Sequence, residues 1–262
     1  GILKTLNGIT QEEEIPVNSN FIQGLQIDWS RIAEESYLRD IPALRNLTEL
    51  SFTHPVTCLV GENGTGKSTL LEAIAVAAGF NPEGGSRNFR FSTYDSHSEL
   101  CGAMRLIRSY RRPAWSYFLR AESFYNVATQ AENYRDDDLE EYYYARYGGK
   151  SLHHQSHGES FLAMVQANFQ PEGLYLLDEP EAALSPQRQL TLLLEIYRLA
   201  QAHAQFILVT HSPILLGLPG AELLSLDGNA LCPIAYTDTE SYQVTRMFIE
   251  QREGLLKKLL EE

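Results

Sequence analysis

The stretch that decides the fold reads Val56-Thr57-Cys58-Leu59-Val60-Gly61-Glu62-Asn63-Gly64-Thr65-Gly66-Lys67-Ser68-Thr69-Leu70. An apolar, β-branched run leads into a glycine-rich turn, and the turn ends in Lys-Ser before a helical pattern over residues 70–75. The motif G-x-x-x-x-G-K-[ST] requires this strand–loop–helix context. The stretch therefore predicts a loop whose backbone N–H groups wrap a phosphate at the positive end of a helix.

Each residue type in this loop has a physical reason. Glycine allows backbone conformations that a Cβ forbids. Lys67 should reach the β- and γ-phosphates, and Ser68 Oγ should ligate Mg²⁺. The alternative is a glycine-rich turn with a chance lysine, which the flanking strand and helix argue against. The candidate nucleotide-binding residues are Gly61, Glu62, Asn63, Gly64, Thr65, Gly66, Lys67, Ser68 and Thr69.

Two carboxylates follow an apolar strand over residues 174–177, in the sequence Asp178-Glu179-Pro180. In open α/β sheets, active residues lie at the carboxyl ends of parallel strands. Asp178 is expected in the Mg²⁺ shell opposite Ser68, and Glu179 is expected to polarise the attacking water as a general base. A helix-capping acidic pair is the alternative.

Two further candidate sites lie nearby in the sequence. His211 follows the strand over residues 206–210, where its ring could bind the γ-phosphate; a lone histidine at a strand end is more often structural. The hexamer over residues 155–160 contains Ser156 and Gly158 ahead of a helix. The Ser156 side chain, the Gly158 N–H group and the N-terminus of that helix would form a second anion site. Alone, this hexamer predicts only a helix cap.

Strands that alternate with helices in the second half of the chain predict an α/β fold with a mainly parallel sheet flanked by helices. We expect strands over 117–121, 173–177 and 206–210, and helices over 127–144, 160–169 and 187–202. Strands over 21–27 and 47–52 should form an N-terminal antiparallel β layer, and 221–226 with 231–236 a hairpin. Residues 31–38 fit a short helix or an irregular loop, and Ile41-Pro42 should break any helix there. Residues 81–85 should end the helix that follows the glycine-rich loop.

The length of 262 residues suggests a single domain. We expect one domain over 1–262, with an inserted helical lobe at 86–155 and a closing C-terminal helix at 237–262. No apolar run approaches the roughly 20 residues of a membrane span. The three cysteines lack metal-ligand spacing, which is typical of a reducing, cytoplasmic location.

The charge is uneven along the chain. The net charge of −13 argues against a surface devoted to nucleic acid. Residues 87–120 nevertheless carry +5, from seven arginines against Asp95 and Glu99. They could pair with the acidic, tyrosine-rich stretch at 132–141 or form a docking face for nucleic acid or an acidic protein. Whether they follow a helix or a strand stays open. The arginines are Arg87, Arg90, Arg105, Arg108, Arg111, Arg112 and Arg120.

Taken together, the motifs resemble the ABC-type ATPases. The loop at 61–69, the Ser-x-Gly-Glu segment, the Asp-Glu-Pro strand end and the Thr-His strand end occur in that family's order. By this resemblance Ser156 matches the signature serine, Gly158 its second glycine and Glu159 its glutamine, while His157 replaces the first glycine. The residues of these motifs are similar to those of SMC and RecF proteins and related single-chain ATPases. Residues 181–185 occupy the place of the family's D-loop but lack its usual serine and aspartate. Glu122 is the candidate for the family's Q-loop residue and a further candidate metal ligand.

The resemblance implies a P-loop ATPase head without a coiled-coil arm. By the same resemblance such a head would bind ATP and Mg²⁺ and hydrolyse ATP between two copies, so that Ser156 would act on the partner's nucleotide. The moving homodimer would drive or gate a protein effector, in DNA maintenance or in defence, with nucleic acid as a further partner. The alternatives are the nucleotide-binding subunit of an ABC transporter and a slow ATP-dependent regulatory switch. Fold analogy does not choose among these roles.

Overall fold

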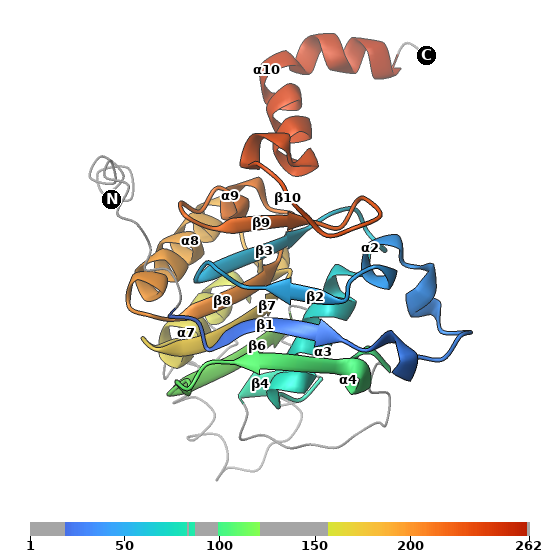
Figure 1. The fold of residues 1–262 in the computed structure, drawn as a ribbon. Coiled ribbons are helices and arrows are strands. Elements are labelled where there is room, and N and C mark those ends of the chain that lie inside the picture. The colour runs from blue at the N-terminus through green and yellow to red at the C-terminus, as the bar shows by residue number, and fades with distance from the viewer. Residues whose placement is uncertain (1–18, 83, 87–98, 121–156, 261–262) are drawn as a thin grey trace, which may run out of the picture.

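The computed structural model describes residues 19–82, 84–86, 99–120 and 157–260. Its main feature is a seven-stranded sheet with the order β10-β9-β3-β8-β7-β6-β4 (Figure 1). The neighbouring pairs from β9 to β6 are parallel, and only the two edge strands are antiparallel. This confirms the predicted α/β fold with a mainly parallel sheet. The strands are β3 (Val56–Val60), β4 (Gly85–Ser86), β6 (Trp115–Arg120), β7 (Gly173–Asp178), β8 (Gln205–Val209), β9 (Glu222–Ser225) and β10 (Cys232–Pro233).

Beside it lies a three-stranded antiparallel sheet of β1 (Ile22–Ile27), β2 (Glu49–Ser51) and β5 (Met104–Arg108), in the order β2-β1-β5. The buried side chain of Gln205 joins the two sheets, because its amide accepts from Ile22 N at 2.9 Å and donates to Ile22 O at 2.8 Å. The predicted antiparallel layer is therefore present, and β5 is an addition to it. Together with α4 (Glu99–Ala103) and β6, this strand comes from the segment expected to form an inserted lobe.

Helices cover both faces of the seven-stranded sheet, and its central strands β3, β7 and β8 are therefore buried at every position. Helix α3 (Lys67–Ala78) packs in one apolar cluster with the antiparallel layer, and α7 (His157–Asn168) and α8 (Pro186–Gln201) pack in the other. Helix α3 ends at Gly79, whose φ of 95° forms the C-cap. The helix thus ends before residues 81–85, where we expected it to stop.

The segment before β2 is irregular, with 3₁₀ turns η2 (Trp29–Arg31) and η3 (Tyr37–Asp40). The expectation that Ile41-Pro42 breaks any helix in this segment is confirmed, because η3 ends at Asp40 with the extended Ile41 as its C-cap, and Pro42 begins a separate helix, α2 (Pro42–Arg45). Proline suits the first helical position, where its missing N–H has no partner to lose.

The C-terminal elements are α9 (Pro213–Leu216), the β9–β10 hairpin, η6 (Tyr236–Asp238) and α10 (Glu240–Leu260). The hairpin and the last helix occur where the sequence predicts them. Helix α10 does not close over the fold, however: none of its residues is buried, it stands away from both sheets in Figure 1, and it kinks at Gln251 (φ −128°, ψ 29°). No helix in the described ranges is long and apolar enough to cross a membrane.

Candidate functional site

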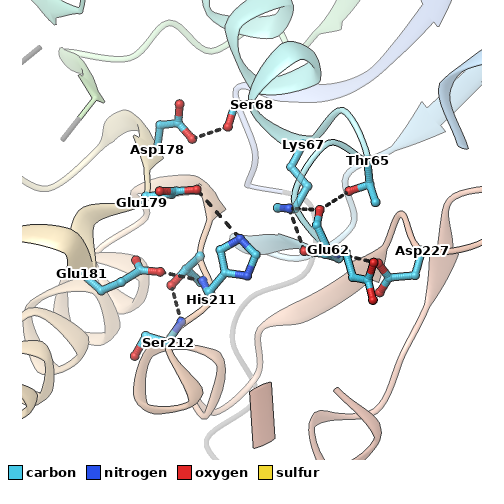
Figure 2. A network of polar contacts seen from close by, with 12 residues as sticks. Glu62, Thr65, Lys67, Ser68, Asp178, Glu179, Glu181, His211, Ser212 and Asp227 are labelled. Carbon is cyan, nitrogen blue, oxygen red and sulfur yellow. Dashed lines mark hydrogen bonds and ion pairs between the residues drawn. The ribbon is translucent and has the colours of Figure 1, made fainter. Parts of the chain in front are cut away.

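The predicted site residues meet at one edge of the large sheet. Strands β3, β7 and β8 run parallel, with β8 between the other two. Their carboxyl ends lead into the glycine-rich loop, the Asp178-Glu179 pair and His211 respectively. Figure 2 shows these side chains facing one another across the end of the sheet. Local sequence predicted each strand end, and the parallel register brings the three together.

The loop after β3 has the left-handed backbone that its glycines permit. Gly64 and Gly66 have φ values of 87° and 90°. A Cβ on Gly66 would also lie 2.8 Å from Leu44 Cδ1, so α2 packs directly under the loop. At Gly64 a Cβ would meet nothing within 4 Å, which leaves that part of the loop open for an anion. Asn63 and Thr65 lie in this turn, and Thr69 lies in the first turn of α3.

Lys67 lies under the loop, and the residue is only 4 % exposed. Its Nζ donates to Gly61 O at 2.7 Å and to Glu62 O at 2.5 Å. Burial lowers the pKa of Lys67, while the nearby carboxylates of Glu179, Asp227 and others act against this shift. The ammonium group is thus already held at the loop where a phosphate would bind.

Ser68 and Asp178 join the loop to the end of β7. Ser68 Oγ donates to Asp178 Oδ1 at 2.9 Å, while Arg120 Nε lies 3.7 Å from the other carboxylate oxygen. Arg120 Nη1 also contacts Glu72 Oε2 of α3 at 2.9 Å. A hydroxyl and a carboxylate are hard oxygen donors of the kind that Mg²⁺ prefers, with water and phosphate oxygens completing its shell. The two residues therefore fit the predicted metal site.

Glu179 has an unusual backbone. Its φ of 49° and ψ of 50° lie in the left-handed region, which costs free energy for a residue with a Cβ. Its N–H still donates to Val209 O at 2.9 Å, so the ladder with β8 continues beyond β7. This turn leads into η5 (Pro180–Ala183) and leaves the carboxylate half-exposed. Glu179 Oε1 lies 3.8 Å from His211 Nε2, so the two predicted catalytic side chains face each other.

Glu181 binds the backbone of His211, a contact that the sequence did not predict. Glu181 Oε1 accepts from the backbone N–H of His211 at 2.6 Å. Its other carboxylate oxygen is buried and has no hydrogen-bond partner within the described residues. Sequence analysis placed Glu181 only in the D-loop position. The signal that could have drawn attention to it is a third acidic residue, after Asp178 and Glu179, followed by the apolar run Ala182-Ala183-Leu184.

Asp227 is a second residue that the sequence did not predict at the site. It lies in the turn between β9 and β10, and its Oδ1 accepts from Glu62 N at 2.6 Å. Ser225 Oγ donates to its other oxygen at 3.1 Å. The turn residues predicted a hairpin, and nothing local indicated that its carboxylate caps the glycine-rich loop.

The arginine-rich segment follows a strand in its central part. Arg105 and Arg108 belong to β5, and Arg108 Nη2 donates to Ala77 O at 2.7 Å. Arg111 Nη1 donates to Ser19 O at 3.1 Å, and its guanidinium lies over the Phe21 ring. With Arg120 held at Asp178, several arginines of the segment bind groups of their own chain.

Some predicted residues cannot be placed. Gly158 and Glu159 lie in the first turn of α7, and their side chains are outside the described structure. Ser156, Glu122, Arg87, Arg90, the acidic stretch at 132–141 and the helix expected at 127–144 lie outside the described residues. The second anion site, the Q-loop residue and the inserted lobe therefore stay predictions.

Two family models match the chain. One is described as "AAA domain" and matches residues 37–142, and the other as "AAA domain, putative AbiEii toxin, Type IV TA system" and matches residues 151–217. The first includes the glycine-rich loop, and the second includes the two strand ends with Glu179 and His211. No curated protein matches the sequence.

Several solved structures are similar. The SMC head domain from Thermotoga maritima is 15% identical with a TM-score of 0.44, over 82% of this chain and 100% of that one. A putative metal-chelate type ABC transporter in an inward-facing conformation is 19% identical with a TM-score of 0.42, over 85% and 87%. The Smc head domain from Pyrococcus yayanosii, with its coiled coil and joint, is 21% identical with a TM-score of 0.27, over 40% and 20%. Both family models are described as AAA domains, and they match the segments that carry the predicted ATPase motifs.

Proposed function

We propose that the chain, whose two matched segments are described as AAA domains, binds ATP with Mg²⁺ and hydrolyses it at the edge formed by β3, β7 and β8. The observation that carries the proposal is the 2.9 Å contact between Ser68 Oγ and Asp178 Oδ1, with Lys67 and Glu179 on either side. It unites an anion-binding loop, two oxygen donors for a cation and a carboxylate that can take a proton.

The residues of the site have separate tasks. The loop N–H groups and Lys67 hold the phosphate chain, and Ser68 and Asp178 hold Mg²⁺. When bound, the ion neutralises charge on the β- and γ-phosphate oxygens. Most of the rate gain then comes from positioning and from charge stabilisation.

Glu179 takes the proton from the attacking water, and His211 holds that water and the γ-phosphate in line. The positive φ of Glu179 supports this assignment, because backbone strain of this kind gathers at functional sites. The turn directs the carboxylate toward His211 instead of continuing along β7. Both side chains are partly exposed, whereas the His211 Nε2 atom that faces Glu179 is buried and has no hydrogen-bond partner within the described residues.

A single copy supplies only part of the site in this proposal. Ser156, Gly158 and Glu159 of one copy would bind the γ-phosphate held by the other, so hydrolysis would need an ATP-dependent dimer. Mixing tests this directly. Lys67→Ala and Ser156→Arg should each be inactive alone, whereas their mixture should regain about one working site per heterodimer, as expected when residues act in trans. A mixture that stays inactive, with both variants folded, would refute the composite site.

The output of the cycle is a gated partner protein. The second family model, whose description names a putative AbiEii toxin of a type IV toxin–antitoxin system, supports an effector in defence over one in transport. The transporter-subunit and slow-switch alternatives make different predictions. A transporter subunit should bring a membrane protein with it when captured with ATP and Glu179→Gln, and a slow switch should show a burst of one turnover followed by almost none.

A further inference from the structure

A cluster of four polar side chains lies at the predicted metal site. Ser68 and Glu72 both belong to α3, and residues four apart share one face of a helix. Arg120 ends β6 and Asp178 ends β7, and the two are register partners, so their strands end side by side. The four side chains therefore meet where α3 begins beside the ends of these two strands.

The two oxygens of the Asp178 carboxylate face different neighbours. Oδ1 accepts from Ser68 Oγ at 2.9 Å, and this is the pair of oxygens that fits a cation (Figure 2). Oδ2 lies 3.7 Å from Arg120 Nε. The Asp178 side chain is only 11 % exposed, so water screens the guanidinium beside it weakly. An incoming cation thus meets a hydroxyl beside one oxygen and a positive charge beside the other.

Two further contacts fix Arg120 in this position. Its Nη1 donates to Glu72 Oε2 at 2.9 Å and to Pro82 O, in the turn after α3, at 3.3 Å. A guanidinium presents its donors in a rigid planar fork, so a single arginine can lie against two carboxylates at once. Glu72 on one side and Asp178 on the other therefore hold the Arg120 side chain between α3 and β7.

The formal charges of this cluster partly cancel. Two carboxylates and one guanidinium give a net charge of −1. Without Glu72, Arg120 would offset the charge of Asp178 and oppose the binding of a cation. Without Arg120, two partly buried carboxylates would lie near one another. The cluster as it stands keeps the charge of one carboxylate for a metal ion.

The number of carboxylate oxygens on offer separates Mg²⁺ from Ca²⁺. Mg²⁺ demands an octahedral shell at about 2.0–2.1 Å and usually binds one or two carboxylates together with waters and phosphate oxygens. Ca²⁺ takes about six to eight oxygens at about 2.3–2.6 Å and often binds a carboxylate through both of its oxygens. A carboxylate with a guanidinium beside one oxygen therefore suits the smaller ion.

We propose that Arg120 is a positioning residue for Asp178, and that it makes the site select Mg²⁺ over Ca²⁺ by holding Oδ2 and leaving Oδ1 for the ion. Glu72 keeps Arg120 in place and offsets its charge. The inference rests on the proposed function, because it concerns the ion that accompanies the nucleotide. It adds two residues that set the choice of ion by acting through a ligand.

Binding of a fluorescent, non-hydrolysable ATP analogue to the full chain tests the proposal. Its dissociation constant is measured in saturating Mg²⁺ and in saturating Ca²⁺, and the ratio of the two constants gives the ion selectivity. Arg120→Met should lower the selectivity for Mg²⁺ at least about tenfold, because Ca²⁺ gains a second charged oxygen. A purely structural role would weaken binding with both ions and leave the ratio unchanged. An unchanged ratio in the folded variant would overturn the proposal.

The double variant Glu72→Gln with Arg120→Met separates the two effects of the arginine. Arg120→Met alone takes the formal charge of the cluster from −1 to −2, whereas the double variant keeps it at −1. If the guanidinium acts by holding Oδ2, both variants should lose selectivity alike. A return to wild-type selectivity in the double variant would make net charge the cause and overturn the proposal. The double variant also leaves no unpaired carboxylate on α3, so it provides the test where the single variant fails to fold.

Arg108→Met is the matched control. Arg108 contacts the other end of α3, where its Nη2 donates to Ala77 O at 2.7 Å, and its loss should leave the selectivity at the wild-type value. An equal loss of selectivity in Arg108→Met and Arg120→Met would overturn the proposal. Circular dichroism checks the folding of each variant.

The wild-type chain separates the failure of this inference from the failure of the proposed function. If it binds the analogue with neither ion, the proposed function fails and the inference fails with it. If it binds the analogue equally well with both ions, ATP binding stands and only the role of Arg120 is overturned. Tighter binding with Mg²⁺ than with Ca²⁺, lost in Arg120→Met and kept in Arg108→Met, is the expected result.

Discussion

Glu181 offers the sharpest test of how the site is built. Its carboxylate joins the turn after β7 to the end of β8, through the 2.6 Å hydrogen bond from the N–H of His211. A hydrogen bond to a charged group contributes about 1.5–3 kcal/mol. Glu181→Ala removes the acceptor and leaves the N–H without its partner. We therefore expect the free energy of unfolding to fall by about 2 kcal/mol.

The effect on turnover should be separate from the effect on stability. His211 would lose the contact that sets its position, so part of the same free energy should be lost from the transition state. Each 1.36 kcal/mol corresponds to a factor of ten, so all of about 2 kcal/mol would be about thirtyfold, and we expect kcat to fall by about three- to thirtyfold with KM nearly unchanged. Glu181→Gln keeps a neutral acceptor and should recover about half of the loss in free energy, because charge-assisted bonds are about twice as strong as neutral ones.

Gln189→Ala is the matched control. Gln189 Oε1 accepts from Ser212 Oγ at 2.6 Å, and its Nε2 donates to Leu184 O at 2.9 Å. This variant should lose comparable stability beside the same turn, yet it leaves the N–H of His211 bonded. Urea unfolding and steady-state ATPase assays on all three variants make the comparison. If Glu181→Ala and Gln189→Ala lose stability equally and both keep wild-type kcat, Glu181 is only structural.

Three further predictions concern the loop, the general base and the core. Lys67→Ala should abolish tight ATP binding, because it removes the cation that lies at the loop; calorimetry showing unchanged affinity in the folded variant would contradict its role. Glu179→Gln should still bind ATP but slow turnover by about a hundredfold or more, the scale of a lost general base, and size exclusion with ATP and Mg²⁺ should show an ATP-dependent dimer accumulating. Burial raises the pKa of the Cys58 thiol from 9.0 to about 12, so the folded chain holds a proton that the unfolded chain releases. The free energy of unfolding therefore keeps its full value below pH 9 and falls as the pH rises toward 12. The total loss is about 4 kcal/mol, at 1.36 kcal/mol per pH unit. Urea unfolding of wild type and Cys58→Ala between pH 8 and 11 isolates it, and two parallel curves would show that Cys58 does not contribute.

Local sequence determined the elements whose signals are short in range. The glycine spacing at 61–66 is sufficient to predict a left-handed turn before a helix, because only glycine adopts those φ values without cost. The apolar runs that became β7 and β8 are buried throughout, so a continuous run without alternation marked them correctly as interior strands. Their ends then placed Asp178, Glu179 and His211.

Tertiary structure decided which side chains these residues bind. The backbone N–H of Glu62 donates to Asp227, 165 positions away in the sequence, and the hydroxyl of Ser68 donates to Asp178, 110 positions away. A carboxylate in a turn carries no local sign of the N–H group that it will accept from, since burial and register choose the partner. The same applies to Arg120, which looked like part of a charged surface and instead lies against Asp178 and Glu72.

The path of the helix at the C-terminus shows the same limit. We expected a closing helix over 237–262, and a helix is present over 240–260. Periodicity reports that one side of a helix will be covered, but it does not identify what covers it. Burial on the chain's own core and burial on another chain both remove apolar surface from water, and both require the same spacing of side chains. Only the tertiary structure showed that α10 leaves this side unused by its own fold.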